Sequence, residues 1–432
     1  MKRNSRLLLF LIGLLSQTQI SFIGSIGISE LLIFLVAPLV FFLDYNRLRV
    51  DGFLPFVWLA LSCCLTCVLS SGINNTPLIF VIKGIAHPYS LFALVVVFHR
   101  LLRNNYKSLK WFLIGACLSR LISMYIFRGA GEEELDKDVL AVGNAARAVL
   151  GLPVSAFYFD LPIPMSALLV VGSGIVYAFF SASSGRSAAA TTLMSALLIC
   201  LGGKSRVRLV KMGRHIGMLV VALLIAAFFL KTGYAYAARN GMLGASAERK
   251  YYEQTRAGDG LLQMLMAGRM EFFCGVWACL DRPIFGFGPK GEDTEGYVER
   301  YWQKFGAKDD YINYIEHVKR QVASQGYFYR RIPAHSYIAM FWIYYGLVGL
   351  LIWIYVLWLF FMYLRKYAAS LPHWYGYLSI ALPFATWNIF FSPFAGRPHA
   401  AMYITCILFT KALFEKRLST PVEILKEMDK YA

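Results

Sequence analysis

Residues 337–364 of this chain read YIAMFWIYYGLVGLLIWIYVLWLFFMYL, without one charged side chain. A helix needs about 20 consecutive apolar residues to cross the hydrocarbon layer of a membrane. Within such a helix the backbone polar groups bond to one another, as a medium without water requires. The stretch therefore predicts a membrane-spanning helix.

Stretches of the same kind recur along the chain. They predict about twelve spanning helices, at 7–23, 27–43, 52–70, 76–98, 110–127, 140–160, 163–181, 187–203, 215–232, 337–364, 374–391 and 399–414. Asn144, Arg147 and Pro153 interrupt the sixth. The predicted fold class is an all-α polytopic membrane protein. We divide it into about nine N-terminal spans in 1–232, an external segment in 233–336, and about three spans with a tail in 337–432.

The composition agrees with this class. Of the 432 residues, 58% are hydrophobic and 16% are charged, whereas soluble domains carry about 25% charged residues. A cytosolic globular domain is thereby excluded. The formal net charge of +18 would suggest nucleic acid in a soluble protein, but in a polytopic membrane protein Lys and Arg collect in cytoplasmic loops. No nucleic-acid partner is expected.

The basic residues predict an orientation. With the N-terminus in the cytoplasm, alternating spans place every strongly basic short loop on one side of the membrane. These loops hold Lys2 with Arg3 and Arg6, Arg47 with Arg49, the runs 100–110 and 204–214, Arg365 with Lys366, and Lys411, Lys416 and Arg417. The acidic run 132–136 falls on the other side. The positive-inside rule requires this distribution, so both termini are predicted to be cytoplasmic.

Residues 233–336 differ from the rest of the chain, since their acids and bases nearly balance and Tyr and Gly are frequent. Three helices are expected in them, at 260–281, 292–304 and 309–324. Asp259 is the expected N-cap of the first helix and Pro283 its stop signal. The turn 285–291 joins the first two helices. The segment therefore predicts a structured domain on the outer face of the membrane.

Several polar side chains fall within the spans or at their ends, where they are costly and tend to mark function. They are Glu30, Lys83, His87, Arg147, Arg186 and Arg397. Lys83 and His87 lie one turn apart and share a face of the fourth span. Snorkelling or helix capping explains each cation taken alone. Taken together, the cations on the outer side suggest a site for an anionic ligand.

One sequence block lies within the external segment, and a second crosses the end of that segment into the next span. The first runs from Ala267-Gly268-Arg269 through Trp277 and Pro283 to Gly286-Phe287-Gly288, and the second from His335-Ser336-Tyr337 to Gly346-Leu347-Val348-Gly349. With the Ser-Gly-Arg-Ser run that contains Arg186, they resemble the signature of the O-antigen polymerase and O-antigen ligase superfamily. The resemblance implies a GT-C-like fold and a metal-independent glycosyltransferase. Such an enzyme acts on polyprenyl-pyrophosphate-linked sugars at the outer, periplasmic face of a bacterial inner membrane.

The resemblance also implies residue roles. Arg186 and Arg269 would clamp the pyrophosphate of the donor, because a guanidinium stays charged and binds phosphate bidentately. His335 would act as the base that takes the proton of the acceptor hydroxyl. Direct displacement would invert the anomeric centre. Arg397 is added to the pyrophosphate site from its position alone, since no family motif contains it.

Lys83 and His87 are candidates for a groove that holds the lipid, although an interhelical hydrogen bond would explain them equally well. No cofactor or metal is expected. A divalent cation needs carboxylate ligands, and the external turns 24–28 and 70–77 offer none apart from the neighbouring Glu30. Two acidic pairs of the external segment remain as alternative ligands, namely Glu292-Asp293 and Asp309-Asp310.

Among the enzymes that the resemblance implies, we expect a polymerase of lipid-linked oligosaccharide repeat units, of the O-antigen or exopolysaccharide type, because polymerases are more diverse and serve more polymer types. The nearest alternative is an O-antigen ligase, which would transfer the glycan to lipid A-core and share the same motifs. A lipid-linked oligosaccharide flippase is a distant alternative, because the sequence shows no internal repeat of the kind transporters carry. The expected partners are the lipid-linked donor, a lipid-linked or lipid A-core acceptor, membrane lipid, a chain-length regulator and a flippase.

Overall fold

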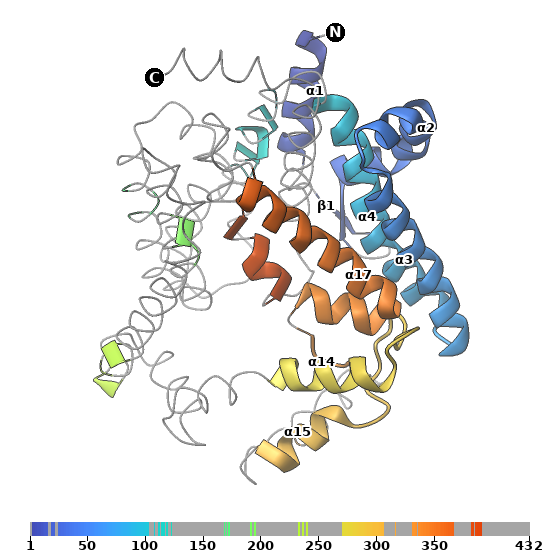
Figure 1. Ribbon diagram of the computed structural model, residues 1–432, viewed down its shortest axis with the longest axis vertical. Helices are drawn as coiled ribbons and strands as arrows, with labels where there is room; N and C mark the ends of the chain where they lie inside the picture. Colours follow the sequence, from blue (N-terminus) through green and yellow to red (C-terminus); the bar gives the residue numbers. More distant parts are fainter. Residues whose placement is uncertain are drawn as a thin grey trace.

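The computed structural model describes residues 2–15, 19–21, 25–102, 270–305, 331–334 and 336–366, with scattered residues in 108–122, 168–172, 191–195, 232–240 and 382–390, and Glu316. Its elements are α1 (Lys2–Leu14), β1 (Gln19–Ser21), β2 (Ser25–Gly27), α2 (Ile28–Val50), α3 (Leu54–Ile73), α4 (Leu78–Leu102), α14 (Met270–Asp281), α15 (Tyr297–Phe305) and α17 (Tyr337–Lys366). The described chain is therefore mostly helical (Figure 1).

Four of these helices are long and apolar enough to cross a membrane: α2, α3, α4 and the Tyr337–Phe360 part of α17. They confirm the second, third, fourth and tenth predicted spans. The side of α2 that is not packed against other helices is apolar. On it, the side chains of Leu35, Leu39 and Phe42 are 69%, 62% and 77% exposed. A continuous apolar stripe of this kind is unfavourable in water and normal against lipid. The chain is a helical membrane protein.

The first predicted span, 7–23, is wrong. Its apolar helix covers only Ser5–Leu14, about 15 Å at 1.5 Å per residue, which is half the hydrocarbon thickness. The chain then forms an antiparallel hairpin in which Gln19 pairs with Gly27 and Ser21 with Ser25. Polar residues from Ser16 to Gln19 end the apolar pattern, and Thr and Ile favour strands. The expectation of an all-α fold is corrected to this extent.

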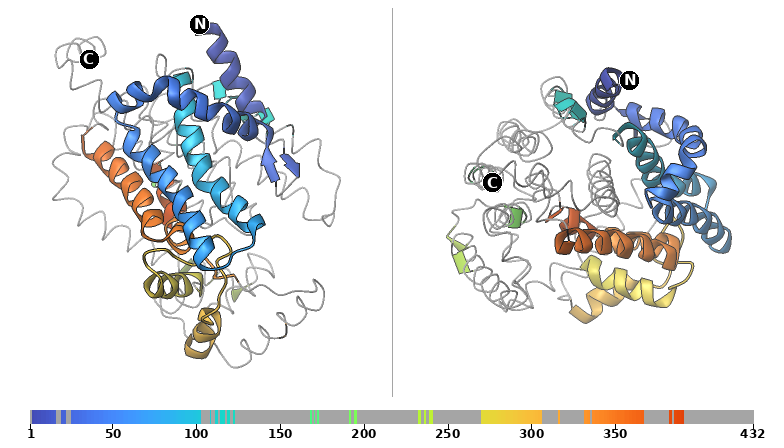
Figure 2. Two further views of the ribbon diagram at one scale, coloured as in Figure 1. Left: turned by 90° about the vertical axis from the view of Figure 1, so that its right-hand side faces the viewer. Right: turned by 45° about the horizontal axis from the view of Figure 1, so that its top comes forward.

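Helix α4 packs against both α2 and α3. Helices α3 and α4 run antiparallel side by side, and α2 crosses them obliquely (Figures 1 and 2). At one end, Arg100 of α4 lies 3.0 Å from the carboxylate of Asp44 on α2, whose side chain is 1% exposed. His99 contacts Asp51, in the turn before α3, at 2.6 Å. The turn between α3 and α4 lies at the opposite end of these helices. The alternation agrees with the predicted spans in this part of the chain.

The predicted external helix 260–281 is described from Met270 onward, and it ends at Asp281, just before the predicted stop at Pro283. The predicted helix 292–304 is shorter than expected, since α15 begins at Tyr297. Gly296, with φ of +71°, has a non-helical backbone conformation directly before Tyr297, so the helix cannot begin earlier. The helix expected at 309–324 lies outside the described residues except for Glu316.

Helix α17 is broken at Gly346, where φ is +63° and ψ is −149°. The residues after α14 fit into this break. The amide of Phe287 donates to the carbonyl of Ile343 at 2.6 Å, and the amide of Leu347 donates to the carbonyl of Ile284 at 3.1 Å. A Cβ on Gly346 would overlap the Ile284 carbonyl. The break thus joins the spanning helix to the segment that precedes it.

We predict that Gly346→Ala lowers the free energy of unfolding by at least about 3 kcal/mol. Alanine is strained in this backbone conformation, and its methyl group would overlap the carbonyl oxygen of Ile284. Gly72→Ala is the matched control, since a Cβ on Gly72 in α3 would meet nothing within 4 Å. Thermal unfolding of the detergent-purified variants measures the difference. Equal midpoints for the two variants would show that the break is not constrained as described.

Candidate functional site

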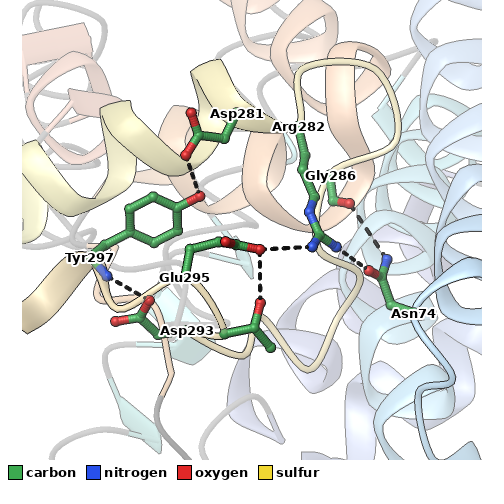
Figure 3. Close-up of polar contacts among 8 residues, drawn as sticks. Asn74, Asp281, Arg282, Gly286, Asp293, Glu295 and Tyr297 are labelled. Carbon is green, nitrogen blue, oxygen red and sulfur yellow. Dashed lines mark hydrogen bonds and ion pairs between the residues drawn. The ribbon is translucent and has the colours of Figure 1, made fainter.

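Arg282, the residue after α14, joins three parts of the chain (Figure 3). Its guanidinium donates to Asn74 Oδ1 at 2.7 Å and to Glu295 Oε1 at 3.1 Å. The same group lies 4.5 Å from the centre of the Phe287 ring. A guanidinium can serve all three partners because it is planar, with donors on its edge and a face for stacking. Arg282 therefore ties the segment between α14 and α15 to the end of α3.

Asn74 completes this link from the side of the membrane helices. It caps α3, donates from Nδ2 to the carbonyl of Ser70 at 2.8 Å, and reaches the carbonyl of Gly286 at 3.5 Å. The predicted external turn 70–77 and the predicted external segment are thus in contact at one end of the molecule. This contact agrees with the alternation of spans, which places both on the same side.

The Gly-Phe-Gly-Pro turn has a structural reason for its composition. Gly286 and Gly288 have φ of +68° and +74°, a region that glycine adopts without strain. Pro289 packs against α4 at Gly84, where a Cβ would overlap the proline ring. The hydroxyl of Tyr345 donates to the Gly84 carbonyl at 2.7 Å. The turn is therefore seated on α3, α4 and α17 together.

The start of α15 is held by carboxylates. Asp293 accepts hydrogen bonds from the amides of Tyr297 and Val298, at 2.8 and 3.0 Å, which satisfies N–H groups that a helix start leaves open and suits the helix dipole. The hydroxyl of Tyr297 donates to Asp281 at 2.7 Å. Burial, followed by this hydrogen bond, raises the pKa of Tyr297. The phenol is neutral at physiological pH and acts as a fixed donor.

These contacts occupy the Glu292-Asp293 pair that sequence alone left as an alternative metal site. Asp293 caps α15, and Glu292 forms an ion pair with Lys290. In the part of the chain that the structure describes, no group of three or more His, Cys, Asp or Glu side chains is arranged to hold a metal. The pair Asp309-Asp310 lies outside that part.

The predicted site residues Arg186, Arg269, His335 and Arg397 also lie outside the described residues. The segments next to two of them are described. Helix α14 begins directly after Arg269, and α17 begins two residues after His335. The two helices pack together: Cys279 of α14 donates from its thiol to the carbonyl of Ala339 at 3.9 Å, and a Cβ on Gly275 would lie 3.4 Å from the Ala339 methyl group.

Lys83 and His87 are both described on α4. Lys83 is exposed and His87 half-buried. Lys83 directly precedes Gly84, where the turn is seated, and it has no ion-pair partner among the described residues. The pair therefore lies on α4 beside Gly84, the residue against which Pro289 of the turn packs.

Sequence reasoning missed Arg282 and Asn74, the residues that organise this end of the molecule. Arg282 lies between the expected end of the helix 260–281 and Pro283. Asn74 lies in the turn 70–77, which the sequence argument considered only for its lack of acidic residues. A signal was present, because an arginine before a Pro-x-x-Gly-x-Gly turn and an asparagine after an apolar span are both unusual for lipid-facing segments.

The fold and these contacts define a helical membrane protein with a structured segment docked on the ends of its spans. Comparison with family models, curated proteins and solved structures finds no match.

We predict that Arg282→Ala lowers the free energy of unfolding by about 1–3 kcal/mol, since it removes two charge-assisted hydrogen bonds at a partly exposed site. Arg282→Lys should recover only part of the loss, because an ammonium group lacks the planar arrangement of donors with which the guanidinium reaches Asn74 and Glu295 together. Unfolding is followed with a thiol-reactive fluorophore. Burial raises the pKa of Cys279 to about 12, so its thiol reacts only once α14 detaches.

The matched control for this series is Arg300→Ala. Arg300 is exposed on α15 and lies 5.8 Å from the Trp277 ring, a contact worth about 0.5–1 kcal/mol. If Arg282→Ala and Arg300→Ala unfold at the same temperature, Arg282 does not hold the segment in place.

Proposed function

We propose that this protein polymerises polyprenyl-pyrophosphate-linked oligosaccharide repeat units, of the O-antigen or exopolysaccharide type, by metal-independent inverting glycosyl transfer. In this proposal the chain has a GT-C-like fold in a bacterial inner membrane, and the predicted spans after the first cross that membrane. The end that carries α14 and α15 faces the periplasm, and the C-terminus is cytoplasmic.

The packing of α14 against α17 is the observation that carries the proposal. Helix α14 follows Arg269, and α17 follows His335, so the two sequence blocks belong to helices in direct contact. A phosphate-binding cation and a proton-accepting imidazole must both reach one anomeric carbon, which requires such proximity. The seating of the Gly-Phe-Gly-Pro turn on three membrane helices supports it further, because rigid elements position reactive groups best.

The proposed reaction needs a base and an anion-binding site. His335 takes the proton of the acceptor hydroxyl as the acceptor oxygen attacks the anomeric carbon. The bond from that carbon to the pyrophosphate oxygen breaks on the opposite face, so the anomeric configuration inverts. Arg186 and Arg269 stabilise the charge on the departing lipid pyrophosphate, with Arg397 as a third cation. Lys83 and His87 line the approach of the lipid.

We predict that purified wild-type protein converts a lipid-linked repeat unit into a ladder of longer glycans. Arg269→Ala and His335→Ala should each lower the rate at least about 100-fold, which is the usual loss when a general base or a charge-stabilising group is removed. Gel analysis of the sugar products measures the rate. Arg300→Ala is the control, since it removes an arginine of the same segment without touching the proposed machinery.

A ladder from both alanine variants at the wild-type rate would contradict the assigned roles. Absence of a ladder from the wild type, with transfer appearing only after lipid A-core is supplied, would identify a ligase with the same clamp and base. Both variants should then lose that transfer as well.

We further predict that millimolar EDTA leaves the wild-type rate unchanged, because the proposed leaving-group charge is met by fixed guanidinium groups and not by a divalent cation. Rates are compared before and after chelation, and again after Mg²⁺ or Mn²⁺ is restored. A loss that either cation reverses would refute the metal-independent mechanism while leaving the transfer reaction itself intact.

A further inference from the structure

A stripe of exposed apolar side chains follows the second half of α17. Leu347, Leu351, Ile354 and Trp358 recur at helical spacing and are 42–48% exposed. Because they lie on a helix long and apolar enough to span a membrane, this stripe is its lipid-facing side.

The stripe does not stop at the break in α17. Leu347 is hydrogen-bonded through its amide to the carbonyl of Ile284, and Ile284 and Phe285 are themselves 62% and 44% exposed. One turn and two turns back along the chain, Leu280 and Val276 of α14 are 64% and 38% exposed. Since they are spaced by four residues, they form one edge of that helix. The apolar surface is therefore continuous from α17 to α14.

The position of this surface along the span is fixed by α17. At 1.5 Å per residue, Leu347 lies about 26 Å from Leu364, the last apolar residue before Arg365 and Lys366. The hydrocarbon layer is about 30 Å thick. The contact between Leu347 and Ile284 therefore lies inside the layer, and α14, which runs across the spans and not along them (Figures 1 and 2), lies near its boundary.

Four backbone polar groups of the turn 283–287 are paired with other parts of the backbone or with a side chain. Irregular backbone in a membrane is tolerated only where its polar groups are paired. The carbonyl of Pro283 accepts from Trp342 Nε1 at 2.9 Å, and the Ile284 carbonyl accepts from Leu347. The amide of Gly286 donates to the carbonyl of Arg282 at 3.1 Å, and that of Phe287 donates to Ile343. A water-exposed loop with apolar side chains outward has no need of such pairing.

We propose that Val276, Leu280, Ile284 and Phe285 form a lipid-contact surface, with the turn 283–287 re-entering one leaflet and α14 lying in the membrane–water interface. Arg282 and Glu295 mark its aqueous side, since both side chains are partly exposed to solvent. The surface anchors the external segment independently of what the protein catalyses. It binds the acyl chains and glycerol region of phospholipids, not a protein partner.

Photocrosslinking tests the proposal. Leu280→p-benzoylphenylalanine is irradiated in the full-length protein, in native membranes and in vesicles of phosphatidylethanolamine and phosphatidylglycerol, and the intact mass of the adduct is read. Trp358→p-benzoylphenylalanine in the α17 stripe is the positive control. Lys304→p-benzoylphenylalanine, at an exposed position of α15, is the negative control. If the first variant does not accumulate, Val276→p-benzoylphenylalanine replaces it.

The expected result is a phospholipid adduct at Leu280 in both preparations, with a yield comparable to that at Trp358 and at least about tenfold above that at Lys304, as contact with the acyl boundary requires. A polypeptide adduct in native membranes would overturn the proposal in favour of a protein partner. No adduct at Leu280, while Trp358 reacts with lipid, would place the surface in water and overturn it as well.

Discussion

The described structure depends on the insertion of a short irregular segment into a broken membrane helix. Gly346 takes a backbone conformation that interrupts α17, and residues 283–287 supply hydrogen-bond partners on both sides of the interruption. A break in a spanning helix would otherwise leave donors and acceptors unpaired, each at a cost of several kcal/mol in lipid. Helix and turn therefore require each other, although about sixty residues of sequence separate them.

Arg282 fixes the orientation of the turn 283–287 relative to α3. Its contacts with Asn74, Glu295 and Phe287 hold the turn against the end of α3, so the turn cannot rotate about the break. Glycines at 84, 286 and 288 remove the side chains that would keep these elements apart. Together the contacts give the segment 282–298 a fixed position on the ends of the spanning helices. A fixed position matters for any chemistry at this end, because reactive groups placed an ångström away lose much of their effect.

The spans were predictable because lipid imposes a strong and simple constraint on composition. The predicted spans that became α2, α3, α4 and α17 start within two residues of the observed helices. The first prediction failed because it continued the span past Leu14, although the chain pairs Gln19–Ser21 with Ser25–Gly27 as a hairpin. The docking of the turn was also beyond sequence reasoning, since Gly346 in Gly-Leu-Val-Gly reads as an ordinary small residue of a span.

The candidate site was predictable in a different sense. Its glycines, Pro283 and the flanking helices were selected from local motifs, and the described structure gives those motifs a role in packing. Local sequence motifs could not reveal that Arg282 and Asn74 are partners. A hydrogen bond between residues about two hundred positions apart leaves no local pattern in the sequence. The roles of Arg269 and His335 rest on chemistry and resemblance, which is why the transfer assay is decisive for them.

The ion pair between Asp44 and Arg100 has a consequence for how the protein is made. Asp44 is almost wholly buried on α2, and during synthesis Arg100 follows it only after α3 and nearly all of α4. Until then Arg47, one turn away and 3.4 Å from the carboxylate, is the local counter-charge. The second counter-charge of this buried acid therefore becomes available only when α4, the last of the three helices, has been synthesised and has packed against α2.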